Sequence, residues 1–325
     1  MKAKKIITGI ALVGAIAFTA TGCAGGGGAG GGGGDGVITV GFAQTGSESG
    51  WRSANTESMK EAFSEANGFN LIFNAADNKP EAQIAAVRSF INQGVDAIVL
   101  APIVTDGWDD VLKEAKDANI PVILEDRTVS ASEDLYASWI GLDFKKEGET
   151  AGKWVADNFG STPTNMVVLE GTTGSSAATD RAAGFDAAIE GTDIKVLDSQ
   201  TGNFTRADGK TVMEGFLQKY GSQINLLFAH NDDMGLGALE AIKAAGMTPG
   251  TDIKIVTIDA VKDGMTALSN GEFNYIVECN PLLGEKTAEV VKKVVAGESV
   301  DKSYIVEDQA FDQEQAKKVL DSRPY

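Results

Sequence analysis

Short apolar runs alternate along most of the chain with segments in which apolar residues recur every three or four positions. Residues 37–42 form a run of β-branched and apolar side chains, which is typical of a buried strand. Residues 80–93 instead place Ile84, Val87 and Ile91 on one face of a helix. The regular alternation of the two patterns predicts a protein of the α/β class.

The two patterns together predict ten strands and ten helices. The strands are expected at residues 37–42, 70–73, 95–100, 120–124, 166–169, 194–198, 224–229, 253–258, 274–277 and 303–306. The helices are expected at residues 55–67, 80–93, 108–118, 148–158, 181–189, 208–220, 234–245, 261–268, 283–296 and 313–321. Strands and helices that alternate in this way form parallel, doubly wound sheets with helices on both faces.

The elements form two series of similar size, and no low-complexity linker separates the series. We therefore expect two α/β lobes that move about a hinge, rather than two independent domains. The last two helices and the last strand have no place in a simple series. The simplest packing lets them cross back between the lobes.

Residues 1–22 have the composition of a bacterial lipoprotein signal peptide. Three lysines precede a mostly apolar stretch, residues 6–20, which is short for a membrane span. Small residues then lead to Cys23, which would carry the lipid after cleavage. The alternative is an ordinary signal peptide that is cut at a small residue, with Cys23 incidental.

Residues 23–36 are almost all glycine and cannot bury enough apolar area to fold. A glycine-rich coil of about 14 residues spans roughly 20 Å. This segment is expected to tether a lipid anchor to the globular body. If Cys23 is lipidated, Cys279 is the only other cysteine, so no disulfide can form within the chain.

The 46 acidic and 28 basic side chains give a formal net charge of −18, which argues against a nucleic-acid partner. His230 is the single histidine, which excludes a histidine-rich metal site and leaves one candidate for a Ser-His-Asp arrangement. The charged residues show no nucleophile–base pairing. We therefore expect a protein that is not an enzyme and that needs no cofactor or metal.

Polar residues recur directly after the predicted strands. They are Glu125, Asp126 and Arg127; Asp180 and Arg181; Asn203, Phe204 and Arg206; Asn231, Asp232 and Asp233; and Asp259. Ligands of open parallel sheets bind at the carboxyl ends of the strands, where all of these residues lie. The alternative for each single Asp or Asn is a helix N-cap, and only their accumulation in both series favours a binding site.

The loop after the first strand offers a carboxylate, an indole and a guanidinium at the same edge: Glu48, Trp51 and Arg52. The alternative is that Trp51 belongs to the core and Arg52 to a solvated helix face. Carboxylates, amides and guanidinium groups beside a few aromatic faces suit a neutral, polyhydroxylated ligand. Asp and Asn share hydrogen bonds with hydroxyls, Arg supplies fixed donors, and Phe or Trp packs against the C–H face of a ring.

A family resemblance rests on several of these stretches: VGFAQTGSESGWRSAN, GVDAIVLAP, ANIPVILEDR, LEGTTGSSAATDRAAGF, FAHNDDMGLGALEAI and VTIDA. They are spread from about residue 37 to residue 280. The chain resembles periplasmic sugar-binding proteins of the ribose-binding cluster, the substrate-binding components of ABC importers. The motifs GSESGWR, DR, NFTR and HNDDM are especially similar to the galactofuranose-binding branch and its actinobacterial fructose-binding relatives.

The resemblance implies a periplasmic binding protein type I fold, in which three hinge crossovers join two Rossmann-like lobes. The lobe limits are then residues 37–142 plus 279–306 and residues 143–278 plus 307–325. The implied ligand-binding residues are Glu48, Trp51, Arg52, Asp126, Arg127, Arg181, Phe204, Asn231, Asp259 and Glu278. Cys279 stands beside Glu278 where ribose binders place a glutamine, and strand alternation lets only one of the two face the cleft.

The implied function is capture of a monosaccharide by hinge closure and its delivery to a permease of an ABC importer. Galactofuranose is the first expectation, and fructose or another furanose-accessible sugar is the second. The chain would act as a monomer on the outer side of the cell membrane, held by its lipid. A sensor that presents sugar to a receptor or kinase is the alternative, whereas a LacI-type regulator would need a helix-turn-helix in place of the leader.

Overall fold

The computed structural model describes residues 36–325 of the chain. The expected signal peptide, the lipidated Cys23 and the glycine tether up to residue 35 lie outside the described residues. Residues 36–325 form one compact unit. No helix among them is long and apolar enough to cross a membrane.

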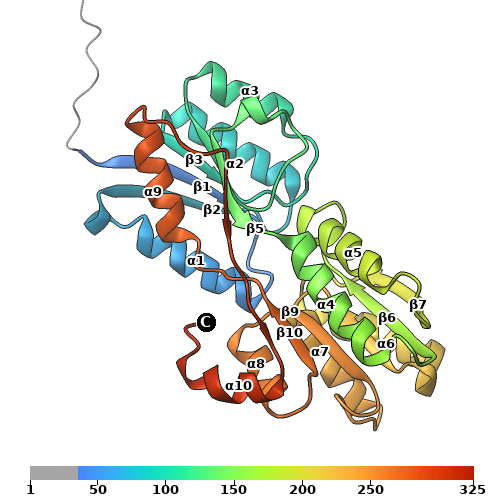
Figure 1. The fold of residues 1–325 in the computed structure, drawn as a ribbon. Helices are drawn as coiled ribbons and strands as arrows, with labels where there is room; N and C mark the ends of the chain where they lie inside the picture. Colours follow the sequence, from blue (N-terminus) through green and yellow to red (C-terminus); the bar gives the residue numbers. More distant parts are fainter. Residues whose placement is uncertain (1–35) are drawn as a thin grey trace, which may run out of the picture. The chain divides into compact units, whose positions relative to one another are not determined.

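The first lobe is built on a six-stranded, wholly parallel sheet with the strand order β11-β5-β4-β3-β1-β2. Its strands are β1 (Ile38–Gln44), β2 (Phe69–Ala75), β3 (Ala97–Leu100), β4 (Val122–Asp126), β5 (Ser138–Leu142) and β11 (Ser303–Val306). Its helices are α1 (Gly50–Ala62), α2 (Pro80–Gln93), α3 (Asp109–Asp117) and α9 (Gly284–Val295). Figure 1 shows α2 and α3 on one face of this sheet and α1 and α9 on the other.

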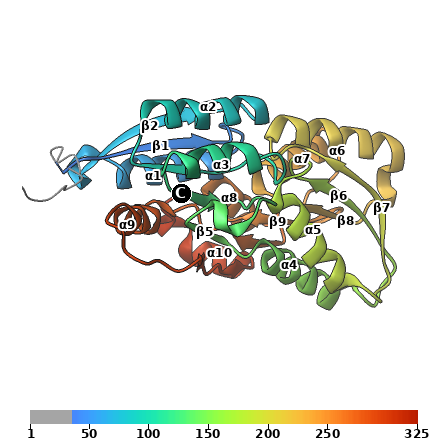
Figure 2. The same cartoon turned by 90° about the horizontal axis from the view of Figure 1, so that it is seen from above.

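The second lobe is built on a six-stranded sheet with the order β12-β10-β9-β8-β6-β7, parallel except for the pairing of β10 with β12. Its strands are β6 (Thr164–Glu170), β7 (Ile194–Thr201), β8 (Leu226–Ala229), β9 (Lys254–Asp259), β10 (Tyr275–Glu278) and β12 (Ala310–Phe311). Its helices are α4 (Phe144–Phe159), α5 (Ser176–Ile189), α6 (Arg206–Tyr220), α7 (Asp232–Ala244), α8 (Lys262–Ser269) and α10 (Gln313–Val319). Figure 2 shows α6 and α7 on one face of the sheet and α4 and α5 on the other.

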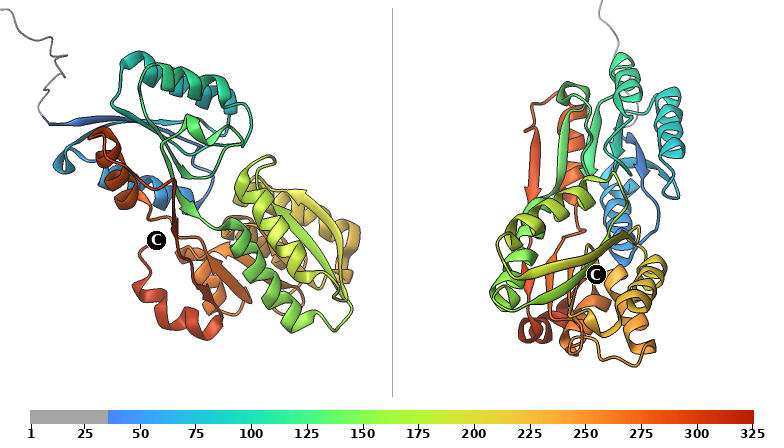
Figure 3. Two further views of the ribbon diagram at one scale, coloured as in Figure 1. Left: turned by 45° about the horizontal axis from the view of Figure 1, so that its top comes forward. Right: turned by 90° about the vertical axis from the view of Figure 1, so that its right-hand side faces the viewer.

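The chain passes between the two sheets three times, after β5, after β10 and after β11. We call these connections the first, second and third crossovers; they run side by side in Figure 3. The predicted fold class, two doubly wound α/β lobes joined by three hinge crossovers, is confirmed. It places the carboxyl ends of the parallel strands of both lobes toward a common space.

The sequence analysis did not predict two strands, β5 and β12. β5 has the sequence SWIGL, in which a serine and a glycine interrupt the apolar run. Gly141 is required there because a Cβ atom would come within 2.4 Å of the Trp139 ring. β12 has only two residues, too few for any periodicity to be visible.

Helix α1 begins five residues earlier than predicted and ends at Ala62, and a separate 3₁₀ turn, Glu65–Asn67, follows it. Its early start has a local cause, because the Ser49 side chain accepts a hydrogen bond from the Arg52 amide and so caps the helix. The start at Gly50 places Trp51 and Arg52 in the first turn of the helix. Further 3₁₀ turns occur at Glu133–Leu135, Gly221–Gln223 and Leu320–Ser322.

Close helix packing in the second lobe depends on glycines at the contact. A Cβ atom at Gly148 of α4 would lie 2.1 Å from the carbonyl oxygen of Arg181 in α5. A Cβ atom at Gly237 of α7 would lie 2.0 Å from the carbonyl oxygen of Arg206 in α6. Backbones can approach this closely only without side chains between them. The contact at Gly148 brings α4 near enough for its side chains to reach Arg181.

A buried carboxyl group holds α7 against its neighbours in the second lobe. Asp232 is fully buried, and it accepts hydrogen bonds from the Thr257 hydroxyl at 2.5 Å and the Val261 amide at 2.9 Å. Burial, and to a smaller extent the charge of Asp233, raises the pKa of Asp232 to about 7. One of the polar residues that follow the predicted strands therefore has a structural role.

We expect the pH dependence of stability to report on Asp232. Because its pKa rises from 3.8 to about 7 on folding, its contribution to the free energy of unfolding is complete below pH 3.8 and is lost as the pH rises through 7. Asp232→Asn removes this loss, which amounts to at most about 1.4 kcal/mol per pH unit. Urea unfolding should therefore show a smaller decline for the variant than for the wild type between about pH 4 and pH 8.

The matched control is Asp109→Asn, which changes an exposed residue in the first turn of α3. Its unfolding free energy should follow the wild-type pH profile. Parallel profiles for the wild type and Asp232→Asn would contradict the assignment.

Candidate functional site

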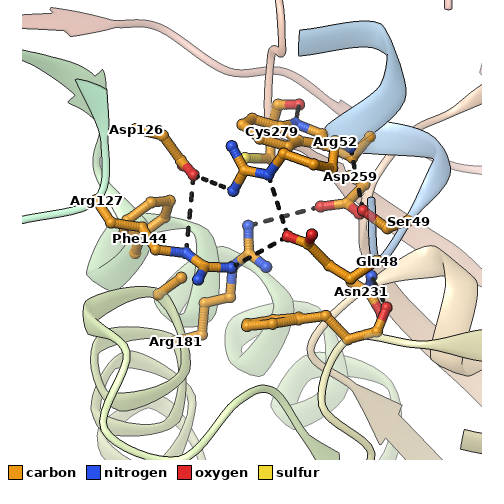
Figure 4. A pocket seen from close by; sticks show the side chains of 13 residues that line it. Glu48, Ser49, Arg52, Asp126, Arg127, Phe144, Arg181, Asn231, Asp259 and Cys279 are labelled. Atoms are coloured by element: carbon orange, nitrogen blue, oxygen red, sulfur yellow. Dashed lines mark hydrogen bonds and ion pairs between the residues drawn. The ribbon is translucent and has the colours of Figure 1, made fainter. Parts of the chain in front are cut away.

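A pocket lies where the two lobes meet, and its empty space, counted together with the open solvent at its mouth, is about 290 Å³ (Figure 4). It is lined by residues of both lobes and of the second crossover: Glu48, Ser49, Trp51, Arg52, Asp126, Arg127, Phe144, Ala177, Arg181, Phe204, Asn231, Asp259 and Cys279. Nine of the ten residues that the sequence analysis proposes as ligand-binding are among them.

The first lobe contributes a buried ion-pair network centred on Arg52. Its Nε atom lies 3.1 Å from Glu48 Oε1, and its Nη2 atom lies 2.5 Å from Asp126 Oδ2. Its Nη1 atom donates to Asn55 Oδ1 at 3.2 Å. The guanidinium is only 1% exposed, and its two carboxylate partners are almost as deeply buried. Burial opposes the ionisation of Glu48, but Arg52 and Arg127 outweigh it and lower the pKa of Glu48.

A second carboxyl group supports this network from behind. Glu125 precedes Asp126 and accepts a hydrogen bond from Asn55 Nδ2 at 2.6 Å. Its other oxygen is buried without a hydrogen-bond partner. Burial and the charge of Asp126 raise the pKa of Glu125 to about 8. The Glu125 carboxyl is therefore mostly protonated at neutral pH, which limits the negative charge beneath the pocket.

Arg127 is the guanidinium with the longest contacts in the pocket. Its Nη1 atom makes a long hydrogen bond of 3.4 Å to the Ile103 carbonyl oxygen, and its Nη2 atom stays 3.8 Å from Glu48. Its buried Nε atom lies 3.7 Å from Asp126 Oδ2, too far for a hydrogen bond, and has no other acceptor within residues 36–325. Burial and the nearby charge of Arg52 lower the pKa of Arg127. The guanidinium also lies over the ring of Phe204, with Cζ 5.0 Å from the ring centroid.

The second lobe contributes Arg181, which is held by a residue outside the pocket. Its Nε atom lies 2.7 Å from Glu147 Oε2, and its Nη1 atom donates to the His230 carbonyl oxygen at 2.6 Å. Its Nη2 atom lies 3.6 Å from Asp259 Oδ1 and faces the pocket (Figure 4). Burial opposes the charge, but Glu147 outweighs it, so the pKa of Arg181 is raised. Sequence analysis missed Glu147, which lies in the first turn of α4 and follows β5, a strand that was not predicted.

The charged side chains that line the pocket balance one another, with three guanidinium groups and three carboxyl groups. Burial raises the pKa of Asp259 well above its ordinary value, and the charge of Arg181 opposes this rise. Counted as formal charges, the lining leaves no net charge for a charged ligand to neutralise, and an unpaired buried charge is costly. The pocket is therefore suited to a neutral molecule with many hydrogen-bonding groups.

Three residues of the pocket have backbone angles in the left-handed region. The φ angles are 61° at Asp126, 62° at Phe204 and 128° at Asp259. Such angles cost about 1–3 kcal/mol each for residues other than glycine, and they persist only where the surroundings fix them. At Phe204 the packing explains the constraint, because a Cβ atom on Gly171 would lie 1.9 Å from its ring. The glycine in the loop after β6 thus makes room for the aromatic wall.

The N-cap alternative is partly correct for Asn231. Its Oδ1 atom accepts from the Met234 amide at 3.0 Å and caps α7, while its Nδ2 atom donates to the Phe204 carbonyl oxygen at 3.1 Å. The residue still lines the pocket. It therefore has two roles, since it begins a helix and holds the aromatic residue beside it.

The neighbouring Asp233 joins the two lobes. It accepts a hydrogen bond from the Gly50 amide of α1 at 2.7 Å and pairs with Arg206 at 3.1 Å. Two further contacts cross between the lobes: Thr128 N–H donates to Ser176 Oγ at 3.1 Å, and Thr105 N–H donates to the Gly174 carbonyl oxygen at 2.9 Å. These contacts surround the pocket.

The sequence left open whether Glu278 or Cys279 faces the pocket, and Glu278 is not among the lining residues. Its carboxylate points away from the lining and pairs with Arg323 Nη2 at 2.6 Å. The next residue, Cys279, lines the pocket instead, and its carbonyl oxygen accepts from Trp51 Nε1 at 2.6 Å. Successive residues of an extended chain point to opposite sides, so only one of the pair can face the pocket.

The remaining lining residues, Ser49, Phe144 and Ala177, gave no chemical signal in the sequence. Ser49 is the N-cap of α1, and its position just before Trp51 could have suggested a place in the pocket. Phe144 begins α4 directly after the first crossover, and the guanidinium of Arg181 lies 5.3 Å from its ring centroid. Trp51 is only 5% exposed, so it belongs to both the core and the pocket.

The single histidine has no acid–base role in this arrangement. His230 is buried, and its Nδ1 atom accepts from the Gly171 amide at 3.3 Å. Burial, reinforced by the charge of Arg181, lowers the pKa of His230 to about 3. Within residues 36–325 no three His, Cys, Asp or Glu side chains are placed to hold a metal ion.

Comparisons with known proteins agree with the fold. A family model described as a periplasmic binding protein domain matches residues 40–299. The galactofuranose-binding protein YtfQ of Escherichia coli is 46% identical over 79% of this chain and 81% of its own. The fructose import binding protein FruE of Bifidobacterium longum is 39% identical over 96% of each chain.

A similar solved structure comes from Mycobacterium smegmatis, in complex with β-D-fucofuranose. It is 57% identical, with a TM-score of 0.85, and the match covers 88% of this chain and 94% of that one. The relatives are binding proteins, which confirms the prediction that the chain is not an enzyme. The family resemblance found in the sequence is confirmed too, and the chain belongs to the periplasmic binding protein family, whose members work outside the cytoplasm.

Proposed function

We propose that this chain captures a monosaccharide in its furanose form and delivers it to the permease of an ABC importer. Galactofuranose is the first candidate, and fructose or another furanose-accessible sugar is the second. The observation that carries the proposal is the buried, charge-balanced pocket between two hinged lobes. The protein would act as a monomer.

The chemistry of the pocket supports a sugar over other small metabolites. A sugar hydroxyl both donates and accepts hydrogen bonds, and the lining offers guanidinium donors beside carboxylate acceptors. Phe204 and Trp51 provide apolar faces for the C–H groups of a ring. A sugar acid or an amino sugar would add an unpaired charge to a lining that is already balanced.

The similar proteins support the furanose form. One is named for galactofuranose, one for fructose, and one was solved with β-D-fucofuranose. The charged pair Glu48 and Arg52, placed beside Trp51, leaves a single aromatic ring on that side of the pocket.

The proposed mechanism is closure about the three crossovers. The moving bodies would be residues 37–142 plus 279–306 and residues 143–278 plus 307–325. A sugar that contacts Arg52 and Arg127 of one lobe and Arg181 and Asp259 of the other favours the closed arrangement, because only this arrangement supplies both sets of contacts. The closed form would then dock on the permease.

The first test is calorimetric titration of the purified protein with D-galactose, D-fructose, D-ribose, methyl β-D-galactopyranoside and D-galacturonate. We expect D-galactose or D-fructose to bind, and the locked pyranoside and the acid to fail. A sugar at about 100 times its dissociation constant should also add roughly 2.7 kcal/mol to the free energy of unfolding. Carbon-13 NMR of bound D-galactose labelled at C1 distinguishes the ring forms by the anomeric shift.

Two results would contradict the proposal. Binding of no neutral sugar would reject the ligand class. A bound pyranose signal would reject the furanose form while leaving sugar capture intact.

Arg127 supplies the most specific mutational prediction. Its donors lack good partners within the protein, so a sugar hydroxyl that accepts from them contributes directly to affinity. Arg127→Met should weaken binding of the sugar identified above by about 10- to 100-fold. The sugar-free protein should lose some stability, because the variant removes a positive charge that stabilises the buried carboxylate of Glu48. Affinity is therefore measured at a temperature where the variant is folded.

The matched control is Arg88→Met on α2, where the arginine pairs with Glu114 at the surface. An exposed pair contributes only about 0–1 kcal/mol, and this one is outside the pocket, so affinity should not change. If Arg127→Met binds sugar as tightly as the wild type, Arg127 does not contact the ligand.

We also propose that Cys23 carries a lipid that holds the protein at the membrane. The support is the sequence alone: a basic start, a short apolar stretch and small residues before the cysteine. Cys23→Ser should abolish incorporation of labelled palmitate and move the protein to the soluble fraction. Cys279→Ser, which changes the buried cysteine in the pocket, should leave both unchanged. Palmitate labelling of Cys23→Ser would reject the anchor.

A further inference from the structure

Glu278 does not line the pocket, yet it is the centre of a compact group of contacts at the hinge. Arg323 Nη2 lies 2.6 Å from Glu278 Oε1, and the Tyr325 hydroxyl donates to the same oxygen at 2.8 Å. Arg323 Nη2 also donates to the Tyr325 hydroxyl oxygen at 2.6 Å, and the guanidinium lies over the Tyr325 ring. The side chains of Glu278 and Arg323 are 5% and 7% exposed. We call Glu278, Arg323 and Tyr325 the clasp.

The clasp holds backbone from two hinge crossovers. Glu278 is the last residue of β10, where the second crossover begins. Its Oε2 atom accepts from the Gln309 amide at 3.1 Å, and its own amide donates to the Gln309 carbonyl oxygen at 2.8 Å, so it also fixes the third crossover. The guanidinium of Arg323 lies over the ring of Phe311 in β12, which follows that crossover.

The clasp also holds the turn that carries Asp259. Arg323 Nε donates to the Ala260 carbonyl oxygen at 2.8 Å. Asp259 and Ala260 have φ angles of 128° and 61°, so the turn is strained at two successive residues. Strain of this kind persists only when neighbouring contacts fix the backbone. The hydrogen bond from Arg323 is one of those contacts.

Two pocket residues are direct neighbours of clasp contacts along the backbone. Asp259 precedes Ala260, and Cys279 follows Glu278. Their backbones meet, since the Cys279 amide donates to the Asp259 carbonyl oxygen at 3.2 Å. The Cys279 carbonyl oxygen in turn accepts from Trp51 Nε1 at 2.6 Å. A short path therefore runs from Arg323 through the backbone to Asp259, Cys279 and Trp51, all of which line the pocket.

We propose that the clasp is a positioning device for the pocket, with Arg323 as a positioning residue that sets sugar affinity through Asp259 and Cys279 without touching the sugar. The proposal rests on the proposed function where its readout is sugar binding. A binding side chain must be held within about 0.5 Å of its productive place by contacts behind it. Loss of the clasp frees the strained turn to relax, and Asp259 then moves away from the ligand.

The test compares Arg323→Gln, Glu278→Gln and the milder Tyr325→Phe with the wild type, using calorimetry with D-galactose and D-fructose. Arg323→Gln should raise the dissociation constant about tenfold, the change expected from one lost hydrogen bond to a charged group. Glu278→Gln should act in the same direction, and the double variant should lose less than the sum, because the two residues act as a unit. Arg323→Lys keeps a positive charge near Glu278 and should recover part of the affinity.

Arg88→Gln is the matched control, since it removes an arginine from a glutamate pair outside the pocket and the hinge. It should leave the dissociation constant unchanged. The variants are compared at a temperature where each is folded, so that a change in affinity is not a change in the folded fraction.

Hydrogen exchange in the sugar-free protein gives a readout that does not depend on sugar binding. In Arg323→Gln the Cys279 amide should exchange faster than in the wild type, while amides of the first sheet should not change. If the wild type binds neither sugar, the proposed ligands are rejected. The exchange rate of the Cys279 amide then still shows whether the clasp positions the pocket backbone. If the variants only melt earlier, with unchanged affinity and unchanged exchange at Cys279, the clasp is a structural contact and the inference is overturned.

Discussion

The pocket depends on the buried ion pairs of charged side chains where the two lobes meet. A buried guanidinium is tolerated only with partners that satisfy it, and Arg52 has Glu48, Asp126 and Asn55. Arg181 has Glu147 and the backbone of His230. Because both arginines are already paired within their own lobe, each lobe brings a prearranged half of the site. Arg127 is the exception, because its Nε–H group has no hydrogen-bond partner among the described residues and remains available to a ligand.

The elements that supply these side chains follow from local rules. Parallel strands end at a common edge of the sheet, so the residues that follow them lie close together at that edge. Glycines then set the distances: Gly148 lets α4 approach α5 until Glu147 reaches Arg181, and Gly171 leaves room for the ring of Phe204. The clasp at Glu278 contacts the pocket residues only through the backbone of the hinge. The pocket is thus shaped by contacts that extend well beyond its lining.

The sequence predicted the fold and most of the pocket lining because both depend on short-range patterns. Asp126 and Asp259 could be found because each lies at the end of a strand, and Arg181 because it follows the polar loop after β6. The choice between Glu278 and Cys279 could not be made, since it depends on which side of a crossover faces the pocket. Glu147 was missed because it lies in the first turn of α4, after β5, and β5 was not predicted. β5 was missed because its serine and glycine have low strand propensity. They are needed there for tertiary packing, which the sequence pattern does not show.

The bridge between Asp233 and the first amide of α1 joins the lobes through protein groups alone. In the proposed mechanism, this bridge and the backbone contact from Thr105 to Gly174 would stabilise the closed arrangement even without a sugar. A permease that recognises the closed arrangement would then sometimes bind the sugar-free protein and hydrolyse ATP without transport. Under this mechanism, a stronger bridge would tighten capture at low sugar concentration, and a weaker one would reduce futile ATP hydrolysis.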